Sequence, residues 1–294
     1  MTSPEAVAAA AETERHGSLR VPTLHLLWMA AFLMVAAPSV LWLAERWTRG
    51  IGAIWYSGQH GIFIPFIAGF FAWRELRQAR EPETGSAWGW LFVLPGLAAM
   101  VLDVVAGTGL LGAIGLVFSL PGLSLLALGA GRTLRLAFPL ALGWLMLPIP
   151  ALLASQAHMV LRLVSASAAS DLLPLFGVAV ARQGTTLLIP RGEVEVSDAC
   201  SGFSTLHASV TLALILAYLT PSPARRVLLL AVAPILAVGT NIVRVTALVL
   251  LCHHYGFELL DTIAHQLSGY AAFAVSLALL FWLAGSDTLG GRAR

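Results

Sequence analysis

Charged residues are scarce in this sequence, and lysine is absent from it altogether. Asp, Glu, Lys and Arg make up 11% of the 294 residues, against about 25% in an average soluble domain. Hydrophobic residues make up 58%, and the arginines stand in short clusters between apolar runs. This composition excludes an ordinary soluble domain. The arginine clusters between apolar runs indicate membrane topology and not nucleic-acid binding.

Cysteine is also rare, and Cys200 and Cys252 are the only two. Two are too few for a disulfide framework, and they lack the C-x-x-C spacing of a metal site. We therefore expect no metal and no cofactor. A disulfide with Cys200 is the main functional alternative to a packing role for Cys252.

Apolar runs long enough to cross a bilayer recur along the chain, since a bilayer core needs about 20 apolar residues per helix. The sequence predicts an all-α polytopic membrane protein with about eight spans. They are Leu24–Ala44, Trp55–Trp73, Trp88–Val105, Leu110–Leu128, Leu136–Leu153, Phe203–Leu219, Val227–Leu251 and Leu267–Ala284. Internal repeats are absent, so a single membrane domain, 24–284, is expected between an N-terminal segment, 1–23, and a tail, 285–294.

Arginine clusters predict the orientation, because arginine is retained on the cytoplasmic side. Every second loop is basic; the clusters are Arg15 and Arg20, then Arg74, Arg77 and Arg80, then Arg132 and Arg135, then Arg225 and Arg226, then Arg292 and Arg294. Exceptions to the pattern are Arg46, Arg49, Arg162, Arg182 and Arg191. Five clusters in register outweigh them, so both termini are expected in the cytoplasm.

The connector 154–199 is the one place with room for extracytoplasmic structure. His158 to Leu173 mixes apolar and polar residues at helical spacing, which predicts an interfacial helix. Short β-branched runs follow Gly177 and predict a small β-ribbon that leads into the sixth span.

Three reactive side chains are expected at one depth, the outer interface. Cys200 precedes the sixth span, Arg244 lies near the outer end of the seventh, and His265 opens the eighth. The positive end of a helix dipole and a nearby cation favour a thiolate nucleophile. We therefore predict that Cys200 attacks, that His265 moves protons and that Arg244 stabilises an oxyanion.

Four further residues are expected to support this trio. Asn241 shares a helix face with Arg244, Asp261 precedes His265 by one turn and could orient its ring, and Ser201 follows the nucleophile. Asp198, or Ser197 beside it, could cap the sixth span. Each of these residues alone has an ordinary structural explanation, and the same holds for His207, His253 and His254. The convergence of the trio carries the hypothesis.

At these residues the chain resembles the exosortase/archaeosortase family of membrane transpeptidases. The matching elements are Ala199-Cys200-Ser201-Gly202, Asn241 to Arg244 and His265 to Gly269, with Leu147-Pro-Ile-Pro150 and a variant element, Ser57-Gly-Gln-His60-Gly61, upstream. The resemblance covers about Trp55 to Phe281. A histidine at position 265 resembles the third site residue of the family's bacterial branch.

The resemblance implies an enzyme that recognises a C-terminal sorting signal made of a Pro-Glu-Pro-like motif, a transmembrane helix and a basic tail. Cys200 would cleave near the motif, form a thioester and pass the acyl group to an amine, a lipid or water. It also implies a bacterial inner membrane location, with the site facing outward and membrane-anchored proteins as partners.

Two other functions stay open at this point. A non-enzymatic component of polysaccharide export would need Arg244 and His265 but not Cys200. A small-molecule transporter would carry charges near mid-membrane; the third to fifth spans offer only Asp103, near an outer end, which argues against a transporter.

Overall fold

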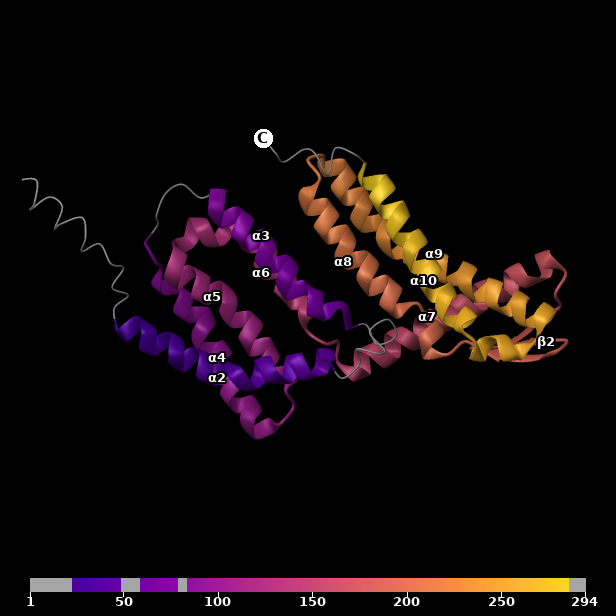
Figure 1. Ribbon diagram of the computed structural model, residues 1–294, viewed down its shortest axis with the longest axis horizontal. Coiled ribbons are helices and arrows are strands. Elements are labelled where there is room, and N and C mark those ends of the chain that lie inside the picture. Colours follow the sequence, from indigo (N-terminus) through magenta and orange to yellow (C-terminus); the bar gives the residue numbers. More distant parts are fainter. Residues whose placement is uncertain (1–22, 49–58, 79–83, 286–294) are drawn as a thin grey trace, which may run out of the picture. The chain divides into compact units, whose positions relative to one another are not determined.

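Helices dominate the computed structural model, which describes residues 23–48, 59–78 and 84–285 (Figure 1). Within these ranges, seven helices are long and apolar enough to cross a membrane, and the only sheet has three short strands. The predicted class, an all-α polytopic membrane protein with a small β-ribbon, is confirmed. By contacts the chain divides into two compact units, Met1–Ala44 with Pro82–Thr133 and Glu45–Glu81 with Leu134–Arg294.

The first unit is built from three apolar helices. They are α2 (Thr23–Thr48), whose last residues belong to the second unit, α4 (Trp90–Ala106), preceded by the 3-10 turn η3 (Ala87–Gly89), and α5 (Leu110–Arg135). Buried small and apolar side chains of α4 and α5, among them Val93, Met100, Ala113 and Val117, form its core. None of the predicted site residues lies in this unit.

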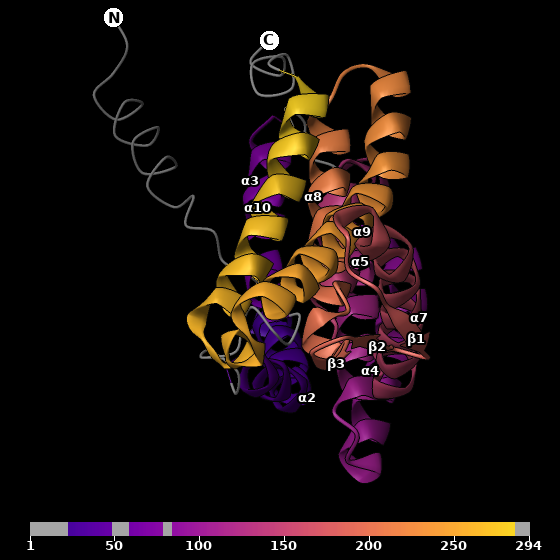
Figure 2. The ribbon, with the colours of Figure 1, turned by 90° about the vertical axis from the view of Figure 1, so that its right-hand side faces the viewer.

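The second unit carries the three helices that surround the predicted site. They are α8 (Phe203–Leu219), α9 (Pro223–Tyr255) and α10 (Ile263–Ala284), and they run side by side (Figures 1 and 2). Ser222 caps α9 by accepting a hydrogen bond from the Arg225 amide, and Pro223 occupies the first turn, where its missing N–H costs nothing. Apolar side chains of all three helices, including Leu216, Leu229 and Leu280, are buried together.

Two predicted spans are shorter than expected. The segment Leu136–Leu153 is broken into α6 (Ala137–Leu142), the 3-10 turn η4 (Gly143–Met146) and the start of the next helix. Proline disfavours helical backbone in the residue before it, and Leu147, which precedes Pro148, is extended with ψ 137°. For Trp55–Trp73, the described part comprises the turn η2 (Gln59–Phe63) and α3 (Ile64–Gln78), whose 15 residues are too few for a span.

The helix predicted from His158 is longer than expected. Helix α7 is Ala151–Leu172, continued by the turn η5 (Leu173–Phe176), and by length and composition it could itself cross a membrane. In Figure 1, α7 crosses the direction of α8, α9 and α10 and does not run parallel to them. It packs mainly against α9, so the predicted helix is present in the fold and starts seven residues earlier than His158, at Ala151, while its interfacial position stays a prediction.

The β-ribbon is an antiparallel sheet of β1 (Ala181–Gln183), β2 (Thr186–Ile189) and β3 (Gly192–Glu195). Leu187 pairs with Arg182 on one side and with Val194 on the other. Alternate side chains of β2 and β3 are buried in a core shared with α7 and α9, which includes Leu187, Val194 and Val196. The sheet is therefore packed against the helices, and β3 leads directly to Cys200.

Candidate active site

A short turn places Cys200 between the sheet and α8. Asp198–Cys200 form the 3-10 turn η6, in which the Cys200 amide donates to the Ser197 carbonyl at 3.0 Å. Gly202 follows in the left-handed region, with φ 79°, and α8 begins at the next residue. The chain thus reverses from strand to helix within a few residues, and the cysteine lies at the reversal.

The predicted capping of α8 by Ser197 or Asp198 is wrong. Gly202 is the N-cap and has no side chain, and the amide of Phe203, the first residue of α8, donates to Ser201 Oγ at 3.3 Å. The reason is that two more residues, Cys200 and Ser201, belong to the reversal. Asp198 instead lies beside Arg162 of α7, with 3.4 Å between Oδ1 and Nε.

Cys200 and His265 are in contact. The thiol Sγ lies 3.5 Å from Nε2 of His265, within hydrogen-bonding reach for sulfur. Cys200 is buried, and Nδ1 of His265 has no hydrogen-bond partner in the described part of the chain. Both cysteines are free thiols, so the alternative of a Cys200–Cys252 disulfide is wrong. A thiol and an imidazole at this distance can exchange a proton.

Asn241 fixes the backbone of Cys200, the predicted nucleophile. Its Nδ2 donates to the Cys200 carbonyl and to Ser165 Oγ, both at 3.0 Å. Gly202 lies against the same side chain, and a Cβ at position 202 would come within 2.5 Å of Asn241 Cγ. Positive φ and this close approach together require glycine, which gives the Ala-Cys-Ser-Gly element a physical reason for its last residue.

Arg244 holds Ala199, the residue before Cys200. Its Nη1 donates to the Ala199 carbonyl at 3.3 Å, and its Nε donates to Ser268 Oγ at 3.1 Å. A Cβ at Gly269 would lie 3.3 Å from the guanidinium carbon, so the absence of a side chain there lets Arg244 rest on α10. The structure records no bond from Nη2 to any described residue, which leaves that donor available.

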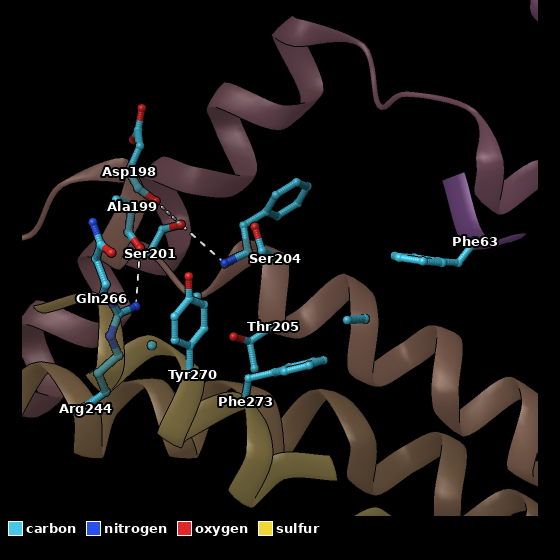
Figure 3. A pocket seen from close by; sticks show the side chains of 14 residues that line it. Phe63, Asp198, Ala199, Ser201, Ser204, Thr205, Arg244, Gln266, Tyr270 and Phe273 are labelled. Carbon is cyan, nitrogen blue, oxygen red and sulfur yellow. Dashed lines mark hydrogen bonds between the residues drawn. The ribbon is translucent and has the colours of Figure 1, made fainter. Parts of the chain in front are cut away.

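Two cavities border these residues. The arginine cavity, of about 100 Å³, includes Arg244 and is walled by α8 and α10, with Phe63 across from them (Figure 3). The thiol cavity, of about 250 Å³, includes Cys200 and His265 and is walled by β3 and α9. Arg244 therefore lines one cavity and Cys200 the other, and Ala199, next to Cys200 in the chain, lines the arginine cavity.

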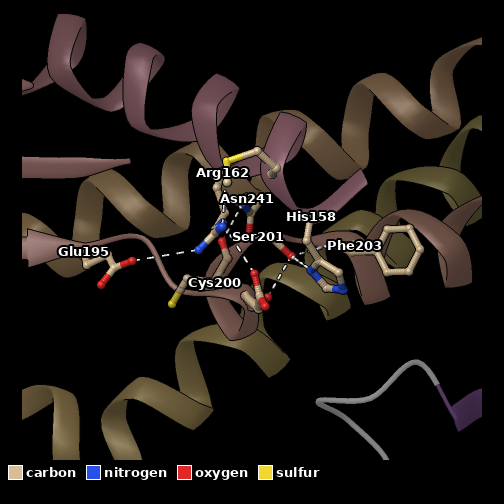
Figure 4. Close-up of polar contacts among 9 residues, drawn as sticks. His158, Arg162, Glu195, Cys200, Ser201, Phe203 and Asn241 are labelled. Atoms are coloured by element: carbon tan, nitrogen blue, oxygen red, sulfur yellow. Dashed lines mark hydrogen bonds and ion pairs between the residues drawn. The ribbon is translucent and has the colours of Figure 1, made fainter. Parts of the chain in front are cut away.

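One face of α7 supports the turn, a feature that the sequence did not reveal. His158, Arg162 and Ser165 are spaced by four and three residues, so they project from the same side of the helix. Nδ1 of His158 lies 2.7 Å from Ser201 Oγ, Arg162 lies beside Asp198 and Glu195, and Ser165 contacts Asn241 (Figure 4). Ser201 Oγ donates to the Asp198 carbonyl, so His158 must be the donor to Ser201.

The remaining predicted residues are placed as follows. The side chains of Asp261, in the turn η7 (Phe257–Asp261), and of His60 lie outside what the structure describes. His207 and Cys252 line neither cavity. His253 and His254 contact each other at the end of α9. The structure thus brings together Cys200, His265, Arg244, Asn241 and Ser201, with Asp198 at the edge.

The donor role of His158 predicts a selective effect. We expect His158→Leu to lower the rate of substrate processing by about tenfold, because a hydrogen bond that positions Ser201 is lost. His158→Asn should recover most of the loss, since the Asn Nδ2 occupies nearly the place of the His Nδ1. Processing of a membrane-anchored substrate in cells measures both. Equal losses in the two variants would contradict the donor role and leave only a packing role.

These features define a multi-pass membrane protein in which a buried thiol contacts a half-buried imidazole between a sheet and a helix bundle. The model of the transmembrane exosortase family matches residues 47–282, and the chain belongs to that family. The match confirms the resemblance, which was expected over about Trp55 to Phe281. No curated protein and no solved structure matches the chain. Family membership supports, in general terms, a role in the processing of sorting signals.

Proposed function

We propose that this protein is a membrane cysteine transpeptidase or peptidase that cleaves C-terminal sorting signals of exported proteins. The single observation that carries the proposal is the 3.5 Å contact between Cys200 Sγ and His265 Nε2 within the family's cysteine element. A thiol next to an imidazole, with its backbone carbonyl and the preceding one both held by donors, is organised as a nucleophile.

The chemistry runs in two halves. His265 Nε2 takes the Cys200 proton, and the sulfur attacks the scissile carbonyl carbon. The oxygen becomes an oxyanion, for which Nη2 of Arg244 is the available donor. The protonated His265 then gives its proton to the leaving amine as the C–N bond breaks, which leaves a thioester on Cys200. An acceptor amine, a lipid hydroxyl or water loses its proton to His265, attacks the thioester and releases the thiol.

Topology supports a site at the outer face of a bacterial cytoplasmic membrane. Cys200 and His265 lie at the starts of α8 and α10, whereas Arg225 lies at the other end of the bundle, where it donates to the Ala284 carbonyl at the end of α10. Since arginine clusters are retained in the cytoplasm, we place the Arg225 end there, together with both termini. A substrate tethered by its own helix would then present its scissile bond near Cys200.

Hydroxylamine tests the thioester directly. We expect a host protein with a short motif, one hydrophobic helix and an arginine-rich tail, co-expressed with this protein, to be released as a C-terminal hydroxamate when membranes are treated with hydroxylamine. The reason is that hydroxylamine attacks the thioester in place of the natural acceptor. Mass spectrometry of the new C-terminus measures it, with Cys200→Ala membranes as control. Processing that continues with no hydroxamate formed would rule out the acyl-enzyme.

A further inference from the structure

The outer edge of β3 borders the cavity that contains Cys200. The strand order is β1-β2-β3, and among the described residues no strand pairs with the far side of β3. An exposed edge offers a row of free N–H and C=O groups to another extended chain. Natural proteins usually cover such an edge, so its place beside Cys200 calls for a physical explanation.

The pairing register shows which backbone groups are free. The Val196 amide donates to the Thr185 carbonyl, and residues two apart along an antiparallel strand face the same neighbour. Val194, opposite Leu187, therefore also points its N–H and C=O toward β2. The backbone groups of Glu193 and Glu195 must then point away from β2, toward the unpaired side.

The cavity reaches from the buried face of β3, which carries Val194, to this edge. Its lining includes four consecutive residues, Val194 to Ser197. A cavity confined to a sheet face would touch only alternate residues, because successive side chains point to opposite faces. The opposite wall is one face of α9, formed by Val245, Leu248 and Val249, and Cys200 and His265 also line the cavity.

We propose that the thiol cavity binds the substrate in extended conformation, as an added strand on the outer edge of β3. This inference rests on the proposed function and specifies how that site takes its substrate. Main-chain hydrogen bonds to Glu193 and Glu195 would give affinity, and the valine-rich wall would select small or branched apolar side chains. The occupant is the peptide segment that precedes the scissile bond.

The direction of the bound segment follows from that of the strand. β3 runs from Gly192 toward Cys200, and the acyl part of the substrate ends at the carbon that Cys200 attacks. Residues that precede the scissile bond must therefore run parallel to β3. A cavity of about 250 Å³ is close to the lower end of the roughly 300–1,000 Å³ of ligand pockets, which suits a short peptide stretch and not a folded domain.

A peptide electrophile on the purified, intact protein tests the edge without knowledge of the natural substrate. The probe is acetyl-Ala-Val-Ala chloromethyl ketone, whose chloride the Cys200 thiolate displaces; peptide mass spectrometry locates the label. Two further probes carry one backbone N-methyl group each, on adjacent residues. Because alternate N–H groups face a neighbouring strand, we expect methylation at one position to slow labelling about tenfold and methylation at the next to have little effect. Equal rates for both would overturn the proposal.

A proline at Glu195 tests the same edge from the protein side. Its N–H points outward, so proline there leaves the β2–β3 pairing intact and removes only the donor offered to the peptide. We expect Glu195→Pro to label about tenfold more slowly than Glu195→Ala, which keeps the N–H but also lacks the carboxylate near Arg162. Equal rates in the two variants would contradict edge binding.

The opposite edge supplies the matched control. β2 is the central strand, so Leu187 bonds toward Val194, and Arg182 of β1, opposite Leu187, must point its N–H outward. Arg182→Pro should label with the peptide at the wild-type rate. If Glu195→Pro does not fold, which iodoacetamide labelling of Cys200 would reveal, the N-methyl pair on the wild-type protein decides the question.

Outcomes for the edge and for the proposed function are separable. If the labelling rate depends on the β3 edge but processing continues in Cys200→Ala, edge binding holds and the enzymatic proposal is wrong. If processing requires Cys200 but the labelling rate is unchanged by the N-methyl group and by the proline, the enzymatic proposal holds and edge binding is wrong.

Discussion

Replacement of Cys200 by alanine is expected to lower substrate processing by at least about 10³-fold, because the acyl intermediate is proposed to form on its thiol. Cys200→Ser should fail as well, since a hydroxyl next to His265 is a far weaker nucleophile than a thiolate at neutral pH. The measurement is the fraction of a membrane-anchored substrate with a basic tail that cells release, followed by immunoblot.

Cys252 supplies the matched control. It is fully buried in the same apolar cluster as Cys200, with 0% exposure, and has no contact with His265 that the structure records. Cys252→Ala removes one buried sulfur and costs some stability, about 1–2 kcal/mol, while processing continues. Full processing in Cys200→Ala cells, with loss in His265→Ala cells, would instead identify a non-enzymatic component whose polar site binds a partner.

The contact between Cys200 and His265 could be anticipated from the sequence because each residue stands in a short local element. Spans of about 20 residues and alternating basic loops place the ends of helices at common depths. That reasoning was sufficient to bring Cys200, Arg244 and His265 to one end of the bundle. Asn241 was also predictable, since its spacing to Arg244 places both on one face of α9.

Positioning residues on α7 could not be predicted in the same way. His158, Arg162 and Ser165 are common residue types on an amphipathic helix, and nothing local indicates that their face meets the turn at Cys200. The contact depends on how α7 crosses α9, which is a property of packing. For the same reason, the division of Arg244 and Cys200 between two cavities was not visible in the sequence.

Span lengths failed where proline interrupts an apolar run. Hydropathy alone does not distinguish a continuous helix from two short ones, so Leu136–Leu153 was predicted as one span. Pro148 and Pro150 stand between η4 and α7, and both lack the amide that a continuing helix would use. The break lets the chain turn into α7, and α7 carries the residues that contact the turn at Cys200.

Arg244→Lys is the second change with a large expected effect. One guanidinium bridges Ser268 and the Ala199 carbonyl through different nitrogens and still has Nη2 to offer. A lysine has a single nitrogen and cannot reproduce this fork. We expect processing to fall by about 10²–10³-fold, the usual loss when one oxyanion donor is removed, although the positive charge is kept.

Arg225→Lys is the matched control, because Arg225 also donates to a backbone carbonyl, that of Ala284, but at the other end of the bundle. Its processing should stay near that of the wild type. Iodoacetamide should still label Cys200 in Arg244→Lys if the turn is intact. If Arg244→Lys loses processing while iodoacetamide still labels Cys200, Arg244 acts on the reacting carbonyl. A loss of both would mean that its bond to Ala199 mainly holds the nucleophile in place, and that the oxyanion donor must be sought elsewhere in the turn.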